Sequence, residues 1–217
     1  MTTLAGLAAA AADCRLMVAG AFHPGDGDGL PDGTGTLVLL APAEPGFWDH
    51  VTQQPEWADG APDPLDRWSR RTVGALAGAL GGTAYFPFGG PPYQPFYQWA
   101  LRSGRAWASP VTLLVHDVAG LMISYRGAIG LHQRLPLPGP AANPCLACPG
   151  RPCLDACPPA ALTAAGYDVP SCHAFLDTPA GNDCLSAGCG VRRACPVSQA
   201  YGRLPAQSAY HMRLFHR

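Results

Sequence analysis

Cysteine is concentrated in one short stretch of this chain of 217 residues, where eight of its nine cysteines fall between positions 145 and 195. They form two blocks, and each block closes with the dipeptide Cys-Pro. Eight thiols supply two complete sets of four ligands, so the sequence predicts two metal centres with four thiolates each. The first block contains Cys145, Cys148, Cys153 and Cys157, and the second contains Cys172, Cys184, Cys189 and Cys195.

The order of these cysteines is similar to the ligand pattern of bacterial ferredoxins. In that pattern a Cys-x2-Cys start wraps one cluster, and the last cysteine of each run ligates the other cluster. A helical Cys-x3-Cys step would carry this last thiolate away from its own block, and Pro158 and Pro196 would then fix the backbone. We therefore expect two crossed 4Fe–4S sites. One would be formed by Cys145, Cys148, Cys153 and Cys195, and the other by Cys157, Cys172, Cys184 and Cys189.

The gaps between the cysteines are longer than in ferredoxins, which leaves another metal open. The first block has four residues, Pro149 to Pro152, at a position where two are usual, and these residues would have to bulge outward. Zinc also accepts four thiolates in a tetrahedral site, so two zinc sites are the alternative. Disulfides are disfavoured by the odd number of cysteines and by the metal-like spacing. Cys14 lies far from both blocks and is not expected to be a ligand.

Composition and charge narrow the classes of partner. All 14 basic residues are arginine and the formal net charge is -1, so the chain has no general positive field for nucleic acid. No apolar run reaches the length of a membrane span. The apolar run at residues 3–12 has no basic segment before it and is followed by Asp13, so we expect an N-terminal helix rather than a signal peptide. A cytoplasmic protein that does not bind membranes is the resulting prediction.

Hydrophobic patterning predicts an α+β protein with a mainly antiparallel sheet and flanking helices. Asp63 and Pro64 mark the start of the clearest helix, which Gly81 and Gly82 end. The turn at residues 117–120 predicts a hairpin between residues 111–116 and 121–129. Other expected elements are helices at 3–12 and 44–54 and strands at 15–22, 36–40 and 83–88. A proline-rich linker at 131–144 separates an α+β domain, residues 1–135, from a loop-rich cysteine module, residues 136–217.

The cysteine blocks and their two Cys-Pro steps resemble the dicluster ferredoxin module of epoxyqueuosine reductases and reductive dehalogenases. The resemblance covers residues 143–200. It implies a ferredoxin-like fold around two 4Fe–4S clusters that pass single electrons.

The N-terminal part resembles a different family, the cobalamin-processing proteins of the cblC type. The similar segments are residues 21–23, residues 36–48 and, above all, the segment Val-His-Asp-Val-Ala-Gly-Leu-Met-Ile-Ser-Tyr-Arg-Gly-Ala-Ile at 115–129. The resemblance implies a nitroreductase-like sheet that holds cobalamin, with His116 and Arg126 near the cofactor.

The residues themselves allow plainer roles for these positions. Arg126 in an apolar strand must find an acceptor, which could be a cofactor or a structural ion-pair partner. His116 could be a turn histidine with satisfied hydrogen bonds. Tyr93 and Trp99, in an aromatic segment, could line a pocket for a flat ligand or belong to the core. His173 follows Cys172 directly and is expected to donate a hydrogen bond to cluster sulfur.

These observations together predict an iron–sulfur electron-transfer protein with a redox partner protein. Its two clusters would deliver electrons to a corrinoid or another acceptor held by the N-terminal domain. Three alternatives stay open: a simple ferredoxin-like carrier, a reductase acting on an organic substrate, and a zinc-stabilised binding protein without a redox role.

Overall fold

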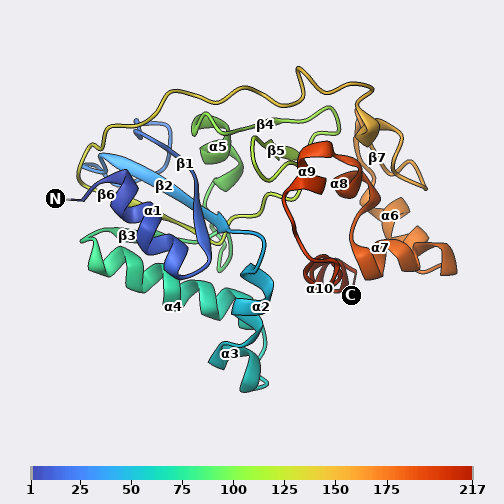
Figure 1. Cartoon of the computed structure of the whole chain (residues 1–217), viewed down its shortest axis with the longest axis horizontal. Helices are drawn as coiled ribbons and strands as arrows, with labels where there is room; N and C mark the ends of the chain where they lie inside the picture. Colours follow the sequence, from blue (N-terminus) through green and yellow to red (C-terminus); the bar gives the residue numbers. More distant parts are fainter. Residues whose placement is uncertain (1, 217) are drawn as a thin grey trace. The chain divides into compact units, whose positions relative to one another are not determined.

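The computed structural model of the chain describes residues 2–216 and is an α+β protein with a mostly antiparallel sheet (Figure 1). The chain divides into two compact units. The first comprises Met1–Ala106 and Ser124–Ala141, and the second comprises Trp107–Ile123 and Ala142–Arg217. The predicted division at residue 135 therefore differs in two respects, because residues 107–123 pack in the second unit and residues 136–141 in the first.

A four-stranded antiparallel sheet forms the centre of the first unit. Its strand order is β1 (Leu16–Phe22), β2 (Thr36–Pro42), β6 (Gly127–Leu131) and β3 (Thr83–Tyr85). Every residue of β2 is buried, as expected of a central strand covered on both faces. The pairing of β1 with β2 shifts register between Val18 and Ala21. Gly20 in this bulge has a φ of +136°, and a Cβ there would lie 2.6 Å from Ser103, so the position needs glycine.

Helices cover this sheet. α1 (Leu4–Asp13) and α5 (Phe96–Arg102) pack on β1, and α4 (Pro64–Ala79) packs on β6 and β3 (Figure 1). Thr3 caps α1 by accepting a hydrogen bond from the backbone N–H of Gly6 at 3.0 Å. α4 starts at Pro64, as predicted, and buries Trp68 against Phe47 with their ring centroids 5.4 Å apart. The predicted helix at 44–54 is shorter, α2 (Phe47–Thr52), and is followed by α3 (Pro55–Ala58).

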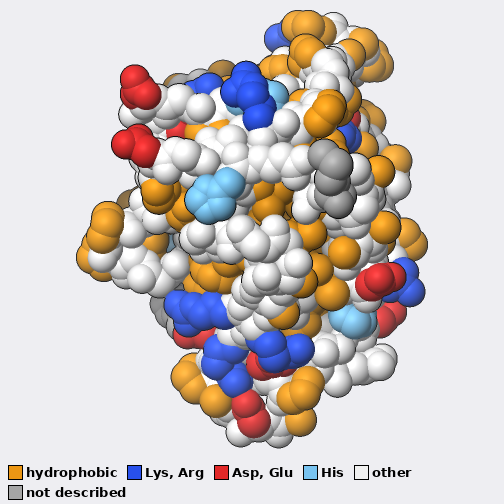
Figure 2. Space-filling view, turned by 90° about the vertical axis from the view of Figure 1, so that its left-hand side faces the viewer, with side chains coloured by type: hydrophobic (Ala, Val, Ile, Leu, Met, Phe, Trp, Pro, Cys, Tyr) orange, Lys and Arg blue, Asp and Glu red, His pale blue; other side chains and the backbone are white. Residues whose placement is uncertain are grey.

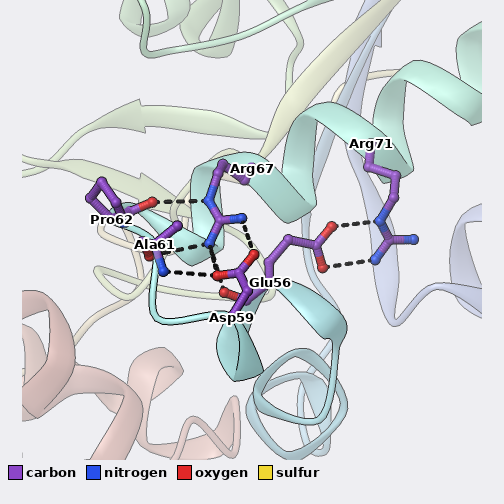
Figure 3. Close-up of polar contacts among 6 residues, drawn as sticks. All are labelled: Glu56, Asp59, Ala61, Pro62, Arg67 and Arg71. Atoms are coloured by element: carbon purple, nitrogen blue, oxygen red, sulfur yellow. Dashed lines mark hydrogen bonds and ion pairs between the residues drawn. The ribbon is translucent and has the colours of Figure 1, made fainter.

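Two arginines of α4 fix α3 and the loop that follows it (Figure 3). Arg67 donates to both carboxylate oxygens of Asp59, at 2.7 and 2.8 Å, and to the carbonyls of Glu56, Ala61 and Pro62. Arg71 donates to both carboxylate oxygens of Glu56, at 2.5 and 3.0 Å. Because Glu56 is buried, its charge depends on this bidentate pair. Arg67 and Arg71 therefore have a structural role, which is to hold α3 and its following loop against α4.

The predicted hairpin around residues 117–120 is wrong. β5 (Leu114–His116) pairs with β4 (Ala106–Ala108), whereas β6 begins only at Gly127 and lies between β2 and β3. Residues 117–120 do form a turn, closed by a bridge between His116 and Gly120. The predicted strand at 121–129 is divided between the two units after Ile123. Its first residues therefore pack in the core of the second unit, and its last residues pack in the core of the first.

The second unit consists of short helices joined by loops, with little sheet (Figure 1). Segment 107–123 belongs to its core, in which Val111, Val115 and Leu121 are buried together with Cys153 and Cys195. Beyond that segment the elements are η1 (Pro152–Leu154), β7 (Leu162–Thr163), β8 (Gly166–Tyr167), α6 (Val169–Leu176), η2 (Pro179–Gly181), α7 (Asn182–Ala187), α8 (Gly190–Ala194), α9 (Pro196–Ala200) and α10 (Pro205–Phe215).

Hydrogen bonds hold segment 107–123 in this core. The Ser198 hydroxyl accepts the N–H of Leu121 at 2.8 Å, and the Arg192 guanidinium donates to the Leu121 carbonyl. A Cβ on Gly120 would lie 2.4 Å from the backbone nitrogen of Ser198, so only glycine fits there. Close packing and directed hydrogen bonds together fix the segment against α8 and α9.

Within residues 2–216, no helix is both long and apolar enough to cross a membrane. The face drawn in Figure 2 mixes hydrophobic side chains with charges of both signs, and acidic groups lie next to the arginines at its lower end. Charges on this face are therefore arranged as a mixture of signs.

Candidate metal centre: two cysteine quartets

Four cysteines from both sequence blocks line one hollow of the second unit. They are Cys145, Cys148, Cys153 and Cys195, which we call the first quartet. The hollow measures about 290 Å³, counting the space open to solvent. Its other walls are mainly apolar and are made by Ser109, Pro110, Val115, Leu121, Arg151, Pro152 and Pro196. The last cysteine of the second block thus stands with three cysteines of the first, as the crossed pattern predicts.

Electrostatic coupling shows that the thiols of the first quartet are mutual neighbours. Burial raises the pKa of Cys145, and the nearby thiols of Cys153, Cys195 and Cys148 raise this pKa further. Burial also raises the pKa of Cys153, with Cys195 and Cys148 adding to the effect. Arg151 acts in the opposite direction on both thiols, since a positive charge favours the thiolate.

The remaining four cysteines, Cys157, Cys172, Cys184 and Cys189, form the second quartet. Burial raises the pKa of Cys172, and the thiols of Cys189, Cys157 and Cys184 raise it further. Burial likewise raises the pKa of Cys184, which is coupled to Cys189. Cys172 thus has the three other cysteines of the predicted second site as electrostatic neighbours, and their joint ligation of a metal stays a prediction.

Several hydrogen bonds reach the sulfurs of the second quartet. The Tyr167 hydroxyl donates to Cys172 Sγ at 3.3 Å, and the backbone N–H of Leu162 donates to Cys157 Sγ at 3.4 Å. The backbone N–H of Gly190 is bonded to Cys184. Donors of this kind stabilise thiolate charge and are among the factors that set cluster potentials.

Short helices place the cysteines of the second block. Cys195 ends α8 and precedes α9, whose first residue is Pro196, so the thiol lies at the corner between two helices. Cys189 is the N-cap residue of α8, and Cys184 lies in α7. Cys172 lies in α6, whose N-cap Asp168 accepts the N–H of Ser171. The backbone at each of these four cysteines is therefore fixed by a short helix or by a helix end.

The extra residues of the first block lie outside the quartet. Residues 149–152 are all exposed, and Gly150 and Arg151 have positive φ values of 70° and 42°. The expected helical step after Cys153 is only the single 3₁₀ turn η1, and Cys157 lies beyond its end. The bulge is therefore exposed, yet Arg151 and Pro152 still line the hollow together with Cys148 and Cys153.

All nine cysteines lie within the described residues and are free thiols. In the same part of the chain, no three His, Cys, Asp or Glu side chains lie close enough together to hold a single metal ion. The quartets are thus neighbouring thiols that do not converge on one point. Cys14 lies in the first unit, where its electrostatic neighbours are Asp13 and Arg71.

The four residues predicted to bind a cofactor are distributed over both units. Trp99 is fully buried in the core, and its indole N–H donates to the Asp28 carbonyl at 2.9 Å, so its predicted place in a pocket is corrected to a core position. Tyr93 is 67% exposed. His116 belongs to the second unit and Arg126 to the first.

The polar residues of this set have structural roles that explain their burial. His116 is fully buried, and its Nδ1 accepts the N–H groups of Val118 and Ala119 at 3.1 and 3.2 Å, as in the turn-histidine alternative. Arg126 donates to the Tyr125 carbonyl and forms an ion pair with Asp66 at 3.4 Å. Burial raises the pKa of Asp66, and Arg126 counteracts the shift.

The hydrogen bond predicted from His173 to cluster sulfur stays a prediction, and the contacts of its ring are with the C-terminal end of the chain. Its Nδ1 lies 2.7 Å from Nδ1 of His216, and its ring stacks on Phe215 with the centroids 4.6 Å apart. The hydroxyl of Tyr167 donates to Cys172. The sequence gives no signal for this, because a tyrosine five positions before a cysteine is not a motif.

No protein-family model, curated protein or solved structure matches the chain. The site is therefore interpreted from its own residues and their geometry.

Proposed function

We propose that the chain is an iron–sulfur electron-transfer protein whose two quartets each hold one 4Fe–4S cluster. The observation that carries the proposal is the crossed grouping, in which Cys195 joins Cys145, Cys148 and Cys153, and Cys157 joins the other three. A ferredoxin-type dicluster module requires this exchange of last ligands. On this proposal the second unit has a ferredoxin-like fold.

The surroundings of the quartets suit clusters that carry electrons. The hollow of the first quartet has mainly apolar walls, which limit contact with water, and Arg151 lies near its thiols. The second quartet receives hydrogen bonds from Tyr167 and two backbone N–H groups, and Arg192 lies near Cys189. When bound, each cluster supplies one-electron chemistry, and burial, charge and hydrogen bonds set its potential.

The direction of electron flow follows from these differences. More donors reach sulfur at the second quartet, whereas an arginine lies near each quartet, Arg151 at the first and Arg192 at the second. Hydrogen bonds to sulfur stabilise the more negative, reduced state. We therefore assign the higher potential to the second quartet, so electrons from a redox partner protein pass from the first cluster to the second.

An acceptor held by the first unit is a separate part of the proposal. A nitroreductase-like sheet that holds a corrinoid rests on sequence resemblance, and one of the predicted contact residues, Trp99, is a buried core residue. The electron-transfer proposal does not depend on it. Cobalt in the purified protein would support the corrinoid, and another acceptor would be sought if cobalt is absent.

The test is anaerobic purification followed by analysis of iron, acid-labile sulfide, zinc and cobalt. We expect about eight iron and eight sulfide per chain and a brown colour that bleaches on reduction. About two zinc per chain without sulfide would overturn the proposal in favour of the zinc-stabilised protein. Anaerobic handling is required because air destroys clusters and leaves thiolates that zinc can occupy.

A further inference from the structure

Ser109 has a buried hydroxyl that the protein itself leaves without a partner. The residue is only 7% exposed, and within residues 2–216 no hydrogen-bond partner of its Oγ is found. A buried hydroxyl without a hydrogen bond costs free energy, so such a group calls for an explanation. Ser109 also lines the hollow of the first quartet, beside its four thiols.

The backbone around Ser109 is fixed. Its N–H donates to the Leu113 carbonyl at 2.8 Å, and its carbonyl accepts the N–H of Thr112 at 3.0 Å, which closes a tight turn. Val111 and Val115, which follow it in the chain, are fully or almost fully buried in the core of the second unit. A rigid turn therefore holds Ser109 at the wall of the hollow, with its hydroxyl buried behind the apolar lining.

This turn does not belong to the cysteine blocks. It lies in segment 107–123, which Ser198 and Arg192 bind through Leu121. Ser198, in α9, closely follows Cys195, so the anchor and a ligand of the first quartet share one helix start. The segment thus brings a polar group from upstream in the chain to the first quartet.

We propose that the Ser109 hydroxyl donates a hydrogen bond to sulfur of the cluster held by the first quartet and raises its reduction potential. The inference rests on the proposed function and names the residue that tunes one of the two clusters. A hydroxyl can donate one hydrogen bond, and cluster sulfides and thiolates are acceptors. The bond strengthens when the cluster gains an electron, because the sulfurs then carry more negative charge, so it favours the reduced state.

The test compares Ser109→Ala with the wild type in EPR-monitored redox titrations of the cluster-loaded protein. The first cluster is identified as the signal that Cys145→Ala loses. We expect Ser109→Ala to lower the equilibrium constant for its reduction about tenfold, or about 59 mV for one electron, with the second cluster unchanged. Ser109→Thr keeps the hydroxyl and should have the same potential as the wild type.

The matched control is Ser124→Ala. Ser124 also has a buried hydroxyl without a partner in the described part of the chain, but it does not line the hollow. Its removal should leave both potentials unchanged. Equal potentials in wild type and Ser109→Ala, in protein with full iron and sulfide, would overturn the inference while leaving the proposed function intact.

A second measurement covers the case in which Ser109→Ala does not assemble the cluster. Electron–nuclear double resonance on the first cluster of wild-type protein in H₂O should show a coupling to an exchangeable proton, and this coupling should disappear after exchange into D₂O. Ser109→Thr in H₂O should show the same coupling. Absence of the coupling would reject the hydrogen bond. Wild-type protein that binds no iron would reject the proposed function, and the inference with it.

Discussion

Cys195 lies at the corner between α8 and α9 and lines the same hollow as Cys145, although the two cysteines come from different sequence blocks. Cys195 contributes to the raised pKa of Cys145, which shows that the thiols are close. Each block therefore supplies a thiol to the other's quartet. Because metal ligation contributes folding free energy in a loop-rich module, we expect neither block to fold around its own metal alone.

The first prediction concerns this exchange of ligands. Cys195→Ala should lose about four iron per chain, and the EPR signal that remains should match that of Cys145→Ala. The reason is that both variants remove a thiol from the first quartet. The remaining cluster should also be lost more readily to a chelator than in wild-type protein, because the two blocks support one another.

Cys184→Ala is the matched control, since it removes a buried thiol of the second quartet that lies closer to Cys195 in sequence. Its remaining EPR signal should differ from that of Cys195→Ala. If the remaining EPR signal of Cys195→Ala instead matched that of Cys184→Ala, and the signal that Cys145→Ala loses were still present, each block would hold its own cluster. The crossed assignment would then be wrong.

The position of Cys195 beside Cys145, Cys148 and Cys153 could be predicted from sequence, because the two blocks follow the crossed ligand order of ferredoxins. The hairpin could not. The stretch from Leu121 to Ile129 is mostly apolar, and nothing in it shows that its first part enters one core and its last part pairs with β2 and β3. Partner strands are chosen by packing between distant residues, which local periodicity does not record.

Trp99 and Ser109 illustrate the same difficulty at single positions. An aromatic ring in a proline-rich segment fits a ligand pocket or a core equally well, and only the indole hydrogen bond to Asp28 places Trp99 in the core. Ser109 is an ordinary serine in sequence. Its interest arises from a turn that buries the hydroxyl beside thiols from a segment downstream.

The second prediction is that Cys14 is not a ligand. It lies at the end of α1 in the first unit, whereas the eight quartet thiols belong to the second unit. Cys14→Ser should therefore leave iron and sulfide per chain unchanged, measured on protein purified anaerobically in parallel with the wild type. A lower iron content in this variant would show that one of the eight has been assigned in error.

The third prediction concerns Tyr167, whose hydroxyl donates to Cys172 Sγ at 3.3 Å. Tyr167→Phe removes one donor from the second quartet and should lower the potential of its cluster by tens of millivolts, since a tenfold change corresponds to about 59 mV. The first cluster should not change. Tyr97→Phe, at an exposed position in α5, is the control and should affect neither potential. Unchanged potentials in Tyr167→Phe would show that this hydrogen bond does not tune the cluster.

The last prediction concerns the pair of Arg71 with buried Glu56 (Figure 3). The hydrogen bonds from Arg71 hold the pKa of Glu56 below its ordinary value of 4.5. A carboxyl group with a lowered pKa contributes stability that is present above the unfolded pKa and is lost as the pH falls through the folded pKa. Arg71 is half exposed, so Arg71→Met should lower the free energy of unfolding at pH 7 by only about 1 kcal/mol.

The difference between wild type and Arg71→Met should begin to shrink as the pH falls through 4.5, where Glu56 is protonated in the unfolded chain. It should vanish below the lowered pKa of Glu56 in the folded wild type, because Glu56 is then protonated in both proteins. Urea unfolding at several pH values measures it. Arg134→Met replaces an exposed arginine of the same unit and should give a small, pH-independent change. A destabilisation by Arg71→Met that stayed constant down to acid pH would mean that packing of the arginine side chain, rather than its charge, supports α3.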